Sequence, residues 1–168
     1  SLKDFSRPYF IGIAGTGMSA IAQYLQGIGM QVAGSDREFS KATVASTKSK
    51  LEQAGVTCYP QDGSGMIDAI DLVVVSSAIE STVQEVVIAK ERGIPIIHRA
   101  ALLALIASSK KTIAVAGTSG KSTTAAMLFD ILEVGGLSPS IISGAGLTRI
   151  IQQGKIGNAV VGQGEWLV

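Results

Sequence analysis

The feature that most constrains the fold is a regular alternation of short apolar runs with segments of helical pattern. Leu72–Ser76 is a continuous run rich in β-branched residues, which is typical of a strand buried on both faces. Alternation of strands with helices predicts an α/β fold with a parallel sheet and right-handed crossovers. The predicted strands are Tyr9–Ala14, Gln31–Ser35, Val56–Tyr59, Leu72–Ser76, Ile94–His98, Thr112–Ala116, Ser140–Ser143, Asn158–Val161 and Trp166–Val168. The predicted helices are Gly17–Gly27, Ser40–Ala54, Ser81–Arg92 (with Ser81 as its cap), Ala100–Ala107 and Lys121–Val134.

Composition narrows the class of protein. Of the 168 residues, 46% are hydrophobic and 16% are charged, which excludes a disordered chain. The net charge of +1 gives no basic excess for nucleic acid. The one cysteine, Cys58, excludes an intrachain disulfide and a cysteine metal site, which fits a reducing compartment. No apolar run approaches the ~20 residues of a membrane span, and residues 1–8 lack the apolar core of a signal peptide. We therefore expect a cytoplasmic protein.

A polar break at Ser108–Lys111 divides the pattern, which restarts after it. We therefore predict two domains with a boundary near residue 109. Residues 1–108 suffice for a complete α/β domain, whereas residues 109–168 are too few and form the start of a second one. The last predicted strand runs to the end of the chain without a turn, so we expect a fragment of a longer protein. Because an incomplete sheet exposes strand edges, we expect residues 109–168 to be disordered or paired with another chain.

A glycine-rich loop links the first predicted strand to the first predicted helix. It follows the pattern G-x-G-x-x-A and reads Gly15-Thr16-Gly17-Met18-Ser19-Ala20. The glycines allow a tight turn and a close approach of phosphate, and the helix N-terminus adds free N–H groups and partial positive charge. Asp36 follows the second predicted strand, where an acid can accept hydrogen bonds from a ribose. This combination predicts a Rossmann-like domain for a nucleotide diphosphate, with an NAD-type dinucleotide among the nucleotides left open.

A second glycine loop follows the predicted strand Thr112–Ala116 and opens the next helix. Its residues are Gly117, Thr118, Ser119, Gly120, Lys121, Ser122 and Thr123. The full P-loop pattern has a glycine six residues before the lysine, where this chain has Val115, so the loop is shorter by two residues. Its chemistry is retained, because Lys121 can reach β- and γ-phosphate oxygens and Ser122 can offer a hydroxyl to Mg²⁺. The loop predicts ATP binding by a P-loop-type α/β domain, with Lys121 and Ser122 as candidate catalytic residues.

In these motifs the chain resembles the N-terminal part of the Mur ligases, the ATP-dependent amide-forming enzymes of peptidoglycan synthesis. The second loop resembles the family's short pattern G-T-x-G-K-[ST]-[ST], with Ser122 where threonine is common. The resemblance is strongest to the alanine-adding branch and covers nearly the whole chain. Its further blocks are Ile11–Ser19, Gly34–Asp36, Ser76–Ile79, Gly93–Ala100 and Gly162–Val168. The family's Mg²⁺-binding carboxylates would follow Val168.

The resemblance implies a function and a set of binding residues. Residues 1–108 would bind UDP-N-acetylmuramate, and residues 109–168 would begin the central domain that binds ATP. ATP would convert the muramic carboxylate into an acyl phosphate, which the amine of L-alanine attacks, while Lys121 and Mg²⁺ neutralise the phosphoryl charge. The implied UDP-sugar-binding residues are Gly15, Thr16, Gly17, Met18, Ser19, Asp36, Ser76, Ser77, His98 and Arg99. Since the metal carboxylates and later domains lie outside this sequence, we expect the chain to bind without catalysing.

Three other functions stay open at this point. A close variant of the family adds a recycled peptide to UDP-N-acetylmuramate, and its N-terminal sequence is similar. A nicotinamide-dependent oxidoreductase domain would use Asp36 for a ribose, but it has no use for the Gly-Lys-Ser triplet that begins at Gly120. A non-catalytic module that senses a UDP-sugar would leave Lys121 and Ser122 unexplained. Binding of UDP-N-acetylmuramate, ATP and NAD separates the last two from a ligase.

Overall fold

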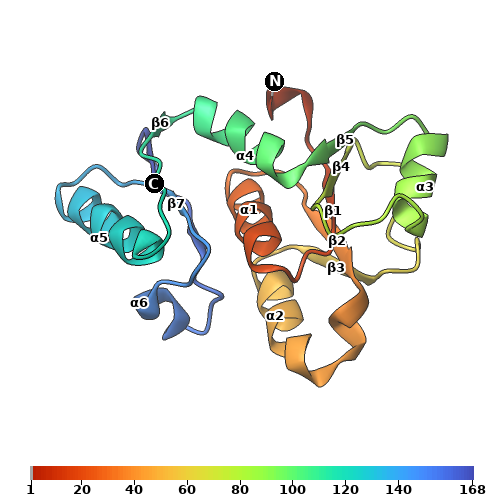
Figure 1. Ribbon diagram of the computed structural model, residues 1–168, viewed down its shortest axis with the longest axis horizontal. Coiled ribbons are helices and arrows are strands. Elements are labelled where there is room, and N and C mark those ends of the chain that lie inside the picture. The colour runs from red at the N-terminus through yellow and green to blue at the C-terminus, as the bar shows by residue number, and fades with distance from the viewer. Residues whose placement is uncertain (1) are drawn as a thin grey trace.

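A computed structural model describes residues 2–168 (Figure 1). Its larger sheet has five strands in the order β3-β2-β1-β4-β5, and every pairing is parallel. The strands are β1 (Pro8–Ile11), β2 (Ala33–Asp36), β3 (Thr57–Pro60), β4 (Leu72–Val75) and β5 (Ile96–His98). Tyr9 of the central strand pairs with Ala33 on one side and with Val73 on the other. The parallel α/β architecture predicted from the alternating pattern is confirmed.

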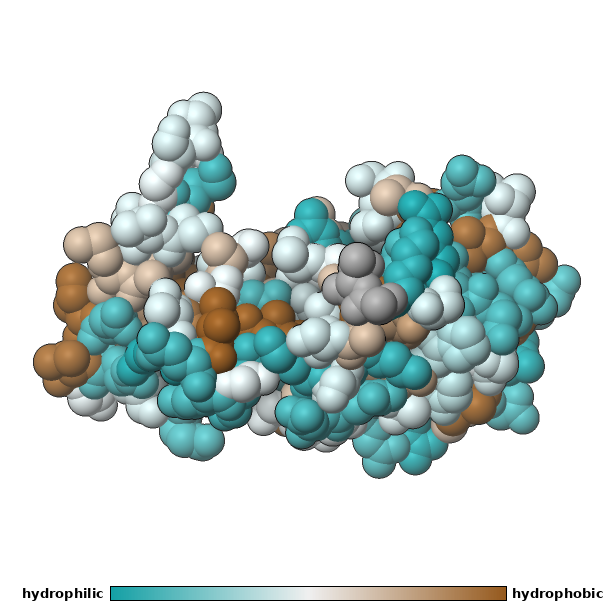
Figure 2. All heavy atoms as spheres, turned by 90° about the horizontal axis from the view of Figure 1, so that it is seen from below, coloured by the Kyte–Doolittle hydropathy of each residue, from teal (hydrophilic) through white to brown (hydrophobic). Residues whose placement is uncertain are grey.

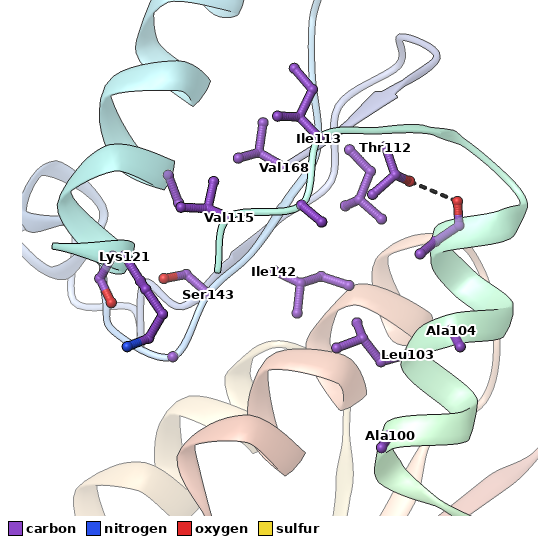
Figure 3. Close-up of a pocket in the computed structure, with 16 residues that line it drawn as sticks. Ala100, Leu103, Ala104, Thr112, Ile113, Val115, Lys121, Ile142, Ser143 and Val168 are labelled. Carbon is purple, nitrogen blue, oxygen red and sulfur yellow. Dashed lines mark hydrogen bonds between the residues drawn. The ribbon is translucent and has the colours of Figure 1, made fainter. Parts of the chain in front are cut away.

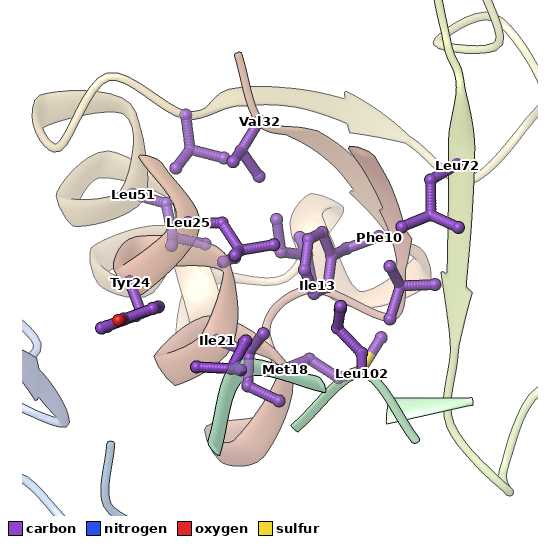
Figure 4. Packing of buried hydrophobic residues seen from close by; sticks show 14 of the residues in the cluster. Phe10, Ile13, Met18, Ile21, Tyr24, Leu25, Val32, Leu51, Leu72 and Leu102 are labelled. Atoms are coloured by element: carbon purple, nitrogen blue, oxygen red, sulfur yellow. The ribbon is translucent and has the colours of Figure 1, made fainter. Parts of the chain in front are cut away.

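Helices cover both faces of this sheet (Figure 1). They are α1 (Thr16–Gly27), α2 (Ala42–Gln53), α3 (Gln84–Glu91) and α4 (Arg99–Ser108). Phe10 points to the face covered by α1, α2 and α4, where it packs in one cluster with Leu25 and Leu102 (Figure 4). Tyr9 and Ile11 point to the opposite face, which α3 covers. Neighbouring residues of a strand point to opposite faces, and all four residues of β1 are buried, so both of its faces are covered. Its side chains are apolar apart from the Tyr9 hydroxyl.

The helix α3 begins later than the sequence suggests. We predicted a start at Ser81 with its hydroxyl as the cap, but the helix starts at Gln84 and its N-cap is Val83. No side chain caps this end. Ser81 instead lies exposed in the turn that leads from β4 to the helix. The prediction of a serine cap is therefore wrong.

The C-terminal part, residues 109–168, contains two small sheets and two helices. Its elements are β6 (Lys111–Thr112), α5 (Lys121–Val134), β7 (Ile141–Ile142), α6 (Thr148–Ile151), β8 (Ala159–Val160) and β9 (Trp166–Leu167). β6 pairs with β9 in parallel, and β7 pairs with β8 antiparallel. Each pair is in register along two residues, so these strands are shorter than predicted. Whether this part is ordered or paired in solution stays a prediction, which amide exchange over residues 112–134 would check. Among residues 2–168, no helix has the length and apolar character needed to cross a membrane.

Helix α1 is buried on two sides and joins the two parts of the chain. None of its twelve residues is charged. The sheet covers one side, and the C-terminal part covers another, with α1 between them in Figure 1. At its C-terminal end a Cβ built on Gly27 would lie 2.6 Å from Cγ2 of Val161, so this glycine permits a close approach. Its buried residues are Met18, Ser19, Ala20, Ile21, Ala22, Tyr24 and Leu25. A helix without a polar face is what burial on opposite sides requires.

A buried carboxylate lies behind the sheet and leads to a first testable prediction. Glu85 of α3 is fully buried, and its Oε1 accepts a hydrogen bond from Ser35 Oγ at 3.0 Å. Its Oε2 has no hydrogen-bond partner among the described residues, and neither has the Tyr9 hydroxyl, whose pKa is raised by burial. Glu85→Gln should therefore stabilise the fold by about 1 kcal/mol, because an amide costs less to bury than an unsatisfied carboxylate oxygen.

Urea unfolding at pH 7 measures this effect. Glu91→Gln is the matched control, because Glu91 lies exposed on the same helix and its substitution removes the same charge. A lower stability of Glu85→Gln than of the parent chain would show that the carboxylate is satisfied, for example by an internal water.

Candidate functional site

The first glycine loop is fixed to the end of the neighbouring strand. Gly12 has φ +78°, and the N–H groups of Gly12 and Ile13 both donate to the Ser35 carbonyl, at 2.8 and 3.0 Å. The next amide, that of Ala14, donates to Oδ2 of Asp36 at 2.9 Å. The loop is thus tied to the carboxyl end of β2 before α1 begins. This geometry places the N-terminus of α1 at the edge of the sheet where ligands bind in such folds.

The first turn of α1 combines two sources of positive charge. The amides of Met18 and Ser19 donate to the Gly15 carbonyl, which leaves the amides of Thr16 and Gly17 at the tip of the helix. A Cβ built on Gly17 would overlap Nη1 of Arg99 and lie 3.1 Å from its Cζ, so the guanidinium lies directly on this glycine. A cation beside a helix N-terminus is unfavourable unless an anion joins them. The arrangement suits a phosphate group.

Three of the predicted UDP-sugar-binding residues line one cavity of about 480 Å³. They are Gly15, Asp36 and Ser76, which come from the carboxyl ends of the three central strands and the loops after them. The Asp36 carboxylate is buried and accepts N–H groups from Ala14 and, through Oδ1, from Glu38 at 2.9 Å. Asp36 therefore also holds the loop in place, a task that the sequence alone did not indicate. Each carboxylate oxygen retains a second lone pair for a ligand.

The other predicted residues of this set lie elsewhere. Met18 is 3% exposed and packs in the core, as Figure 4 shows, and Ser19 is 1% exposed. Ser77 and His98 are exposed but do not line the cavity. His98 is the N-cap residue of α4, and its side chain makes no capping hydrogen bond. The structure therefore brings together Gly15, Asp36 and Ser76, with Thr16, Gly17 and Arg99 beside them. It leaves Met18, Ser19, Ser77 and His98 apart from the cavity.

The second glycine loop is exposed at the start of α5. Gly117 has φ +149° and Gly120, the N-cap residue, has φ +75°, so both occupy conformations that favour glycine. Nζ of Lys121 donates to the carbonyls of Gly117 and Thr118 at 2.7 and 3.2 Å. The ammonium group thus lies over the loop in which a phosphate would bind. The seven residues Gly117, Thr118, Ser119, Gly120, Lys121, Ser122 and Thr123 are all exposed.

An apolar cavity of about 490 Å³ lies between this loop and α4. Lys121 and Ser143 line it on one side, and Ala100, Leu103 and Ala104 of α4 line the other (Figure 3). Ser122 is also among its lining residues. The described residues contain no group of three or more His, Cys, Asp or Glu side chains that could hold a metal ion. The Ser122 hydroxyl could supply one ligand to Mg²⁺, which keeps several waters and takes phosphate oxygens as further ligands.

A buried amide network that we did not predict links the two parts at α1. Asn158 is 3% exposed, and its Nδ2 donates to the Thr16 carbonyl at 2.9 Å and to Ser19 Oγ at 3.0 Å. Its Oδ1 accepts from Nε2 of Gln23 at 2.7 Å. The one signal in the sequence is α1 itself, because an uncharged helix must be covered on more than one side. That signal predicts a neighbour for Gln23 without identifying it.

Comparison with known proteins gives one consistent result. The sequence model of the Mur ligase family, catalytic domain, matches residues 7–111. Curated relatives called UDP-N-acetylmuramate–L-alanine ligase include that of Pelotomaculum thermopropionicum, 44% identical over 95% of this chain, and that of Dictyoglomus turgidum, 43% identical over 99%. The chain spans about a third of the length of these relatives, 32% and 34%.

Solved structures agree with the sequence comparison. The UDP-N-acetylmuramate–alanine ligase of Thermotoga maritima superposes with a TM-score of 0.79 at 30% identity, over 96% of this chain and 36% of that one. A murein peptide ligase of Psychrobacter arcticus superposes with a TM-score of 0.80 at 27% identity, over 97% and 37%. The resemblance seen in the glycine loops thus extends over the whole fold, and the chain belongs to the Mur ligase family.

Proposed function

We propose that this chain is part of an ATP-dependent ligase that joins L-alanine to the carboxylate of UDP-N-acetylmuramate in peptidoglycan synthesis. The observation that carries the proposal is the pair of phosphate-type loops, one on α1 with Arg99 beside it and one on α5 with Lys121. A nucleotide-bearing substrate suits the first loop and ATP the second. The curated relatives, which carry the name of this activity, support the choice of substrate. The reaction would take place in the cytoplasm.

Residues 1–108 would bind the UDP-sugar. Its diphosphate would accept hydrogen bonds from the amides of Thr16 and Gly17 and from the Arg99 guanidinium. Its uridine would lie in the cavity lined by Asp36 and Ser76, with the carboxylate of Asp36 accepting from the nucleoside. His98 and Ser77 are exposed and are adjacent in sequence to Arg99 and Ser76. They would contact a bound UDP-sugar only on the side of the sugar that faces solvent.

Residues 109–168 would hold ATP for the chemical step. The γ-phosphoryl group passes to an oxygen of the muramic carboxylate, which gives an acyl phosphate and ADP. The amine of L-alanine attacks the acyl carbon, and phosphate leaves from the tetrahedral intermediate. Lys121 would donate to the β- and γ-phosphate oxygens and offset the negative charge in transfer, and Ser122 would hold Mg²⁺, which supplies further charge neutralisation.

Calorimetric titration of the chain with UDP-N-acetylmuramate, ATP with Mg²⁺, and NAD tests the proposal. We expect saturable binding of the first two and none of NAD. Arg99→Ala should weaken UDP-sugar binding at least about tenfold, because a charge-assisted contact to phosphate is lost. Gly17→Val should weaken it further, because its side chain displaces Arg99 and covers the amides at the helix tip.

Lys90→Ala is the control, because Lys90 lies exposed on α3 and its substitution makes the same charge change as Arg99→Ala. Binding of NAD without UDP-N-acetylmuramate would overturn the ligase assignment in favour of an oxidoreductase domain. Binding of the UDP-sugar without ATP would favour a sensing module.

A second candidate is the ligase that adds a recycled peptide to the same UDP-sugar. The murein peptide ligase of Psychrobacter arcticus favours it, since its structure matches this chain as well as that of the alanine-adding enzyme of Thermotoga maritima does. Both candidates make the same use of residues 1–108. The higher identity to the curated alanine-adding relatives, 44% and 43%, is why we place this candidate second.

A further inference from the structure

Asn158 links the two parts of the chain by three side-chain hydrogen bonds to α1. It follows α6 and precedes β8, and its partners Thr16, Ser19 and Gln23 all lie in the first two turns of α1. The contacts fix its orientation: Nδ2 faces two acceptors and Oδ1 faces a donor. A flipped amide would set its NH₂ group against that of Gln23 and its oxygen against the Thr16 carbonyl. An asparagine therefore fits this position in one way.

The network also lies directly behind the proposed phosphate site. Asn158 donates a hydrogen bond to the carbonyl group of Thr16. The N–H groups of Thr16 and Gly17 lie at the helix tip, within the same turn. The Ser19 hydroxyl, which donates to the Thr16 carbonyl at 3.1 Å, is part of the same network. A ligand that draws the first turn of α1 toward itself would move these acceptors. The contact is thus placed to transmit a shift of the helix tip to β8.

At its C-terminal end, α1 meets the segment just after β8 through an apolar contact. Val161 packs against Gly27 at the far end of the helix, where no side chain intervenes. Packing of this kind supplies attraction but tolerates sliding, whereas buried hydrogen bonds specify one register. The apolar end thus holds the C-terminal part on α1, and the polar end determines where along the helix it lies.

From these observations we infer that Asn158 is a positioning residue that sets the C-terminal part, with its ATP loop, at one place relative to the phosphate-binding tip of α1. The consequence for binding rests on the proposed function. Binding of the UDP-sugar at the first loop is then coupled to binding of ATP at the second loop, because both ligands favour the arrangement that Asn158 holds. Such coupling must be reciprocal, so each ligand raises the affinity for the other by the same factor.

The first experiment needs no ligand. Spin labels are attached through Glu91→Cys on α3 and Val134→Cys at the end of α5, two exposed positions, in a Cys58→Ala chain. Asn158→Leu, which keeps the number and branching of the side-chain heavy atoms but removes every side-chain hydrogen bond, should broaden and shift the distance distribution between the labels. Gln153→Ala, an exposed amide of the same part, should leave it unchanged. An unchanged distribution in Asn158→Leu would overturn the positioning role.

The second experiment measures ligand coupling in the same chain. In the parent chain, saturation with UDP-N-acetylmuramate should raise the affinity for ATP by about tenfold. In Asn158→Leu this factor should fall below about twofold while each ligand alone binds nearly as before, a pattern that mere loss of stability does not produce. Full coupling in Asn158→Leu would contradict the inference. Absence of UDP-sugar binding in the parent chain would instead refute the proposed function, and the label distances would still decide the role of Asn158.

A second variant covers the case in which Asn158→Leu does not fold. Gln23→Met keeps the length of the side chain and removes the donor to Asn158 Oδ1 and to the Ser19 carbonyl. It leaves in place the hydrogen bonds from Asn158 Nδ2 to the Thr16 carbonyl and Ser19 Oγ. It should give a smaller broadening in the same direction. Identical distributions in Gln23→Met and the parent chain would count against the inference.

Discussion

Lys121→Ala should lower the affinity of the chain for ATP with Mg²⁺ by about a hundredfold, equivalent to about 2.7 kcal/mol of binding free energy. Its Nζ already lies over the loop, bound to the carbonyls of Gly117 and Thr118 at 2.7 and 3.2 Å. ATP would exchange these neutral acceptors for charged phosphate oxygens, which form stronger hydrogen bonds. Alanine removes the charge and leaves the loop backbone intact. Titration calorimetry measures the loss directly.

Lys155→Ala is the control for this prediction, because Lys155 is exposed in the loop before β8 and its substitution changes the net charge equally. The UDP-sugar should bind both variants as it binds the parent chain, since the first loop is unaltered. An unchanged affinity for ATP in Lys121→Ala would show that ATP binds elsewhere. In that case the shortened loop would not be a nucleotide site.

Gly34→Ala should destabilise the fold by about 3 kcal/mol, a large loss of stability for a single added methyl group. Gly34 lies in β2, and a Cβ at this position would be 2.5 Å from the Phe10 carbonyl oxygen and 2.7 Å from Cδ1 of Ile13. The first of these atoms belongs to the central strand, so relief of the overlap requires β1 and β2 to move apart. Urea unfolding followed by circular dichroism measures the free energy of unfolding.

Gly144→Ala provides the comparison for Gly34→Ala. A Cβ on Gly144 has no heavy atom within 4 Å, and the backbone there needs no special conformation. Its stability should equal that of the parent chain. A loss of less than about 1 kcal/mol in Gly34→Ala would mean that the central strands adjust more easily than close-packed interiors usually do.

The kind and order of most elements were predictable from local sequence, but exact ends such as the start of α3, and contacts with distant neighbours, were not. Helix α5 runs from Lys121 to Val134 as predicted, because a glycine precedes it and Gly135 ends it. The strands of the C-terminal part are shorter than predicted, because in the described chain each is paired along only two residues. An apolar run shows that a segment can be a strand but not how far a partner accompanies it.

The candidate site divides in the same way. Gly15, Gly17 and Asp36 were predicted from a strand–loop–helix pattern whose glycines and helix N-terminus are suited to binding phosphate. They lie together at the edge of the sheet. Met18 and Ser19 belong to the same motif, but the 3.6-residue period of the helix turns them toward the interior. The partner of Ser19 is 139 positions away, at Asn158. No local rule reaches that far.

The uncharged helix α1 has a consequence for anyone who wishes to divide this chain. A cut near residue 109, which the sequence pattern invites, would leave the side of α1 around Tyr24 open to water, although that side chain is 1% exposed in the intact chain. It would also leave the amide of Gln23 facing solvent, beside the newly exposed apolar surface of α1. Exposed apolar surface of this kind drives self-association. A soluble excised module would need a polar face designed onto this helix. The burial of α1 therefore depends on both parts of the chain, and we expect residues 1–108 alone to self-associate.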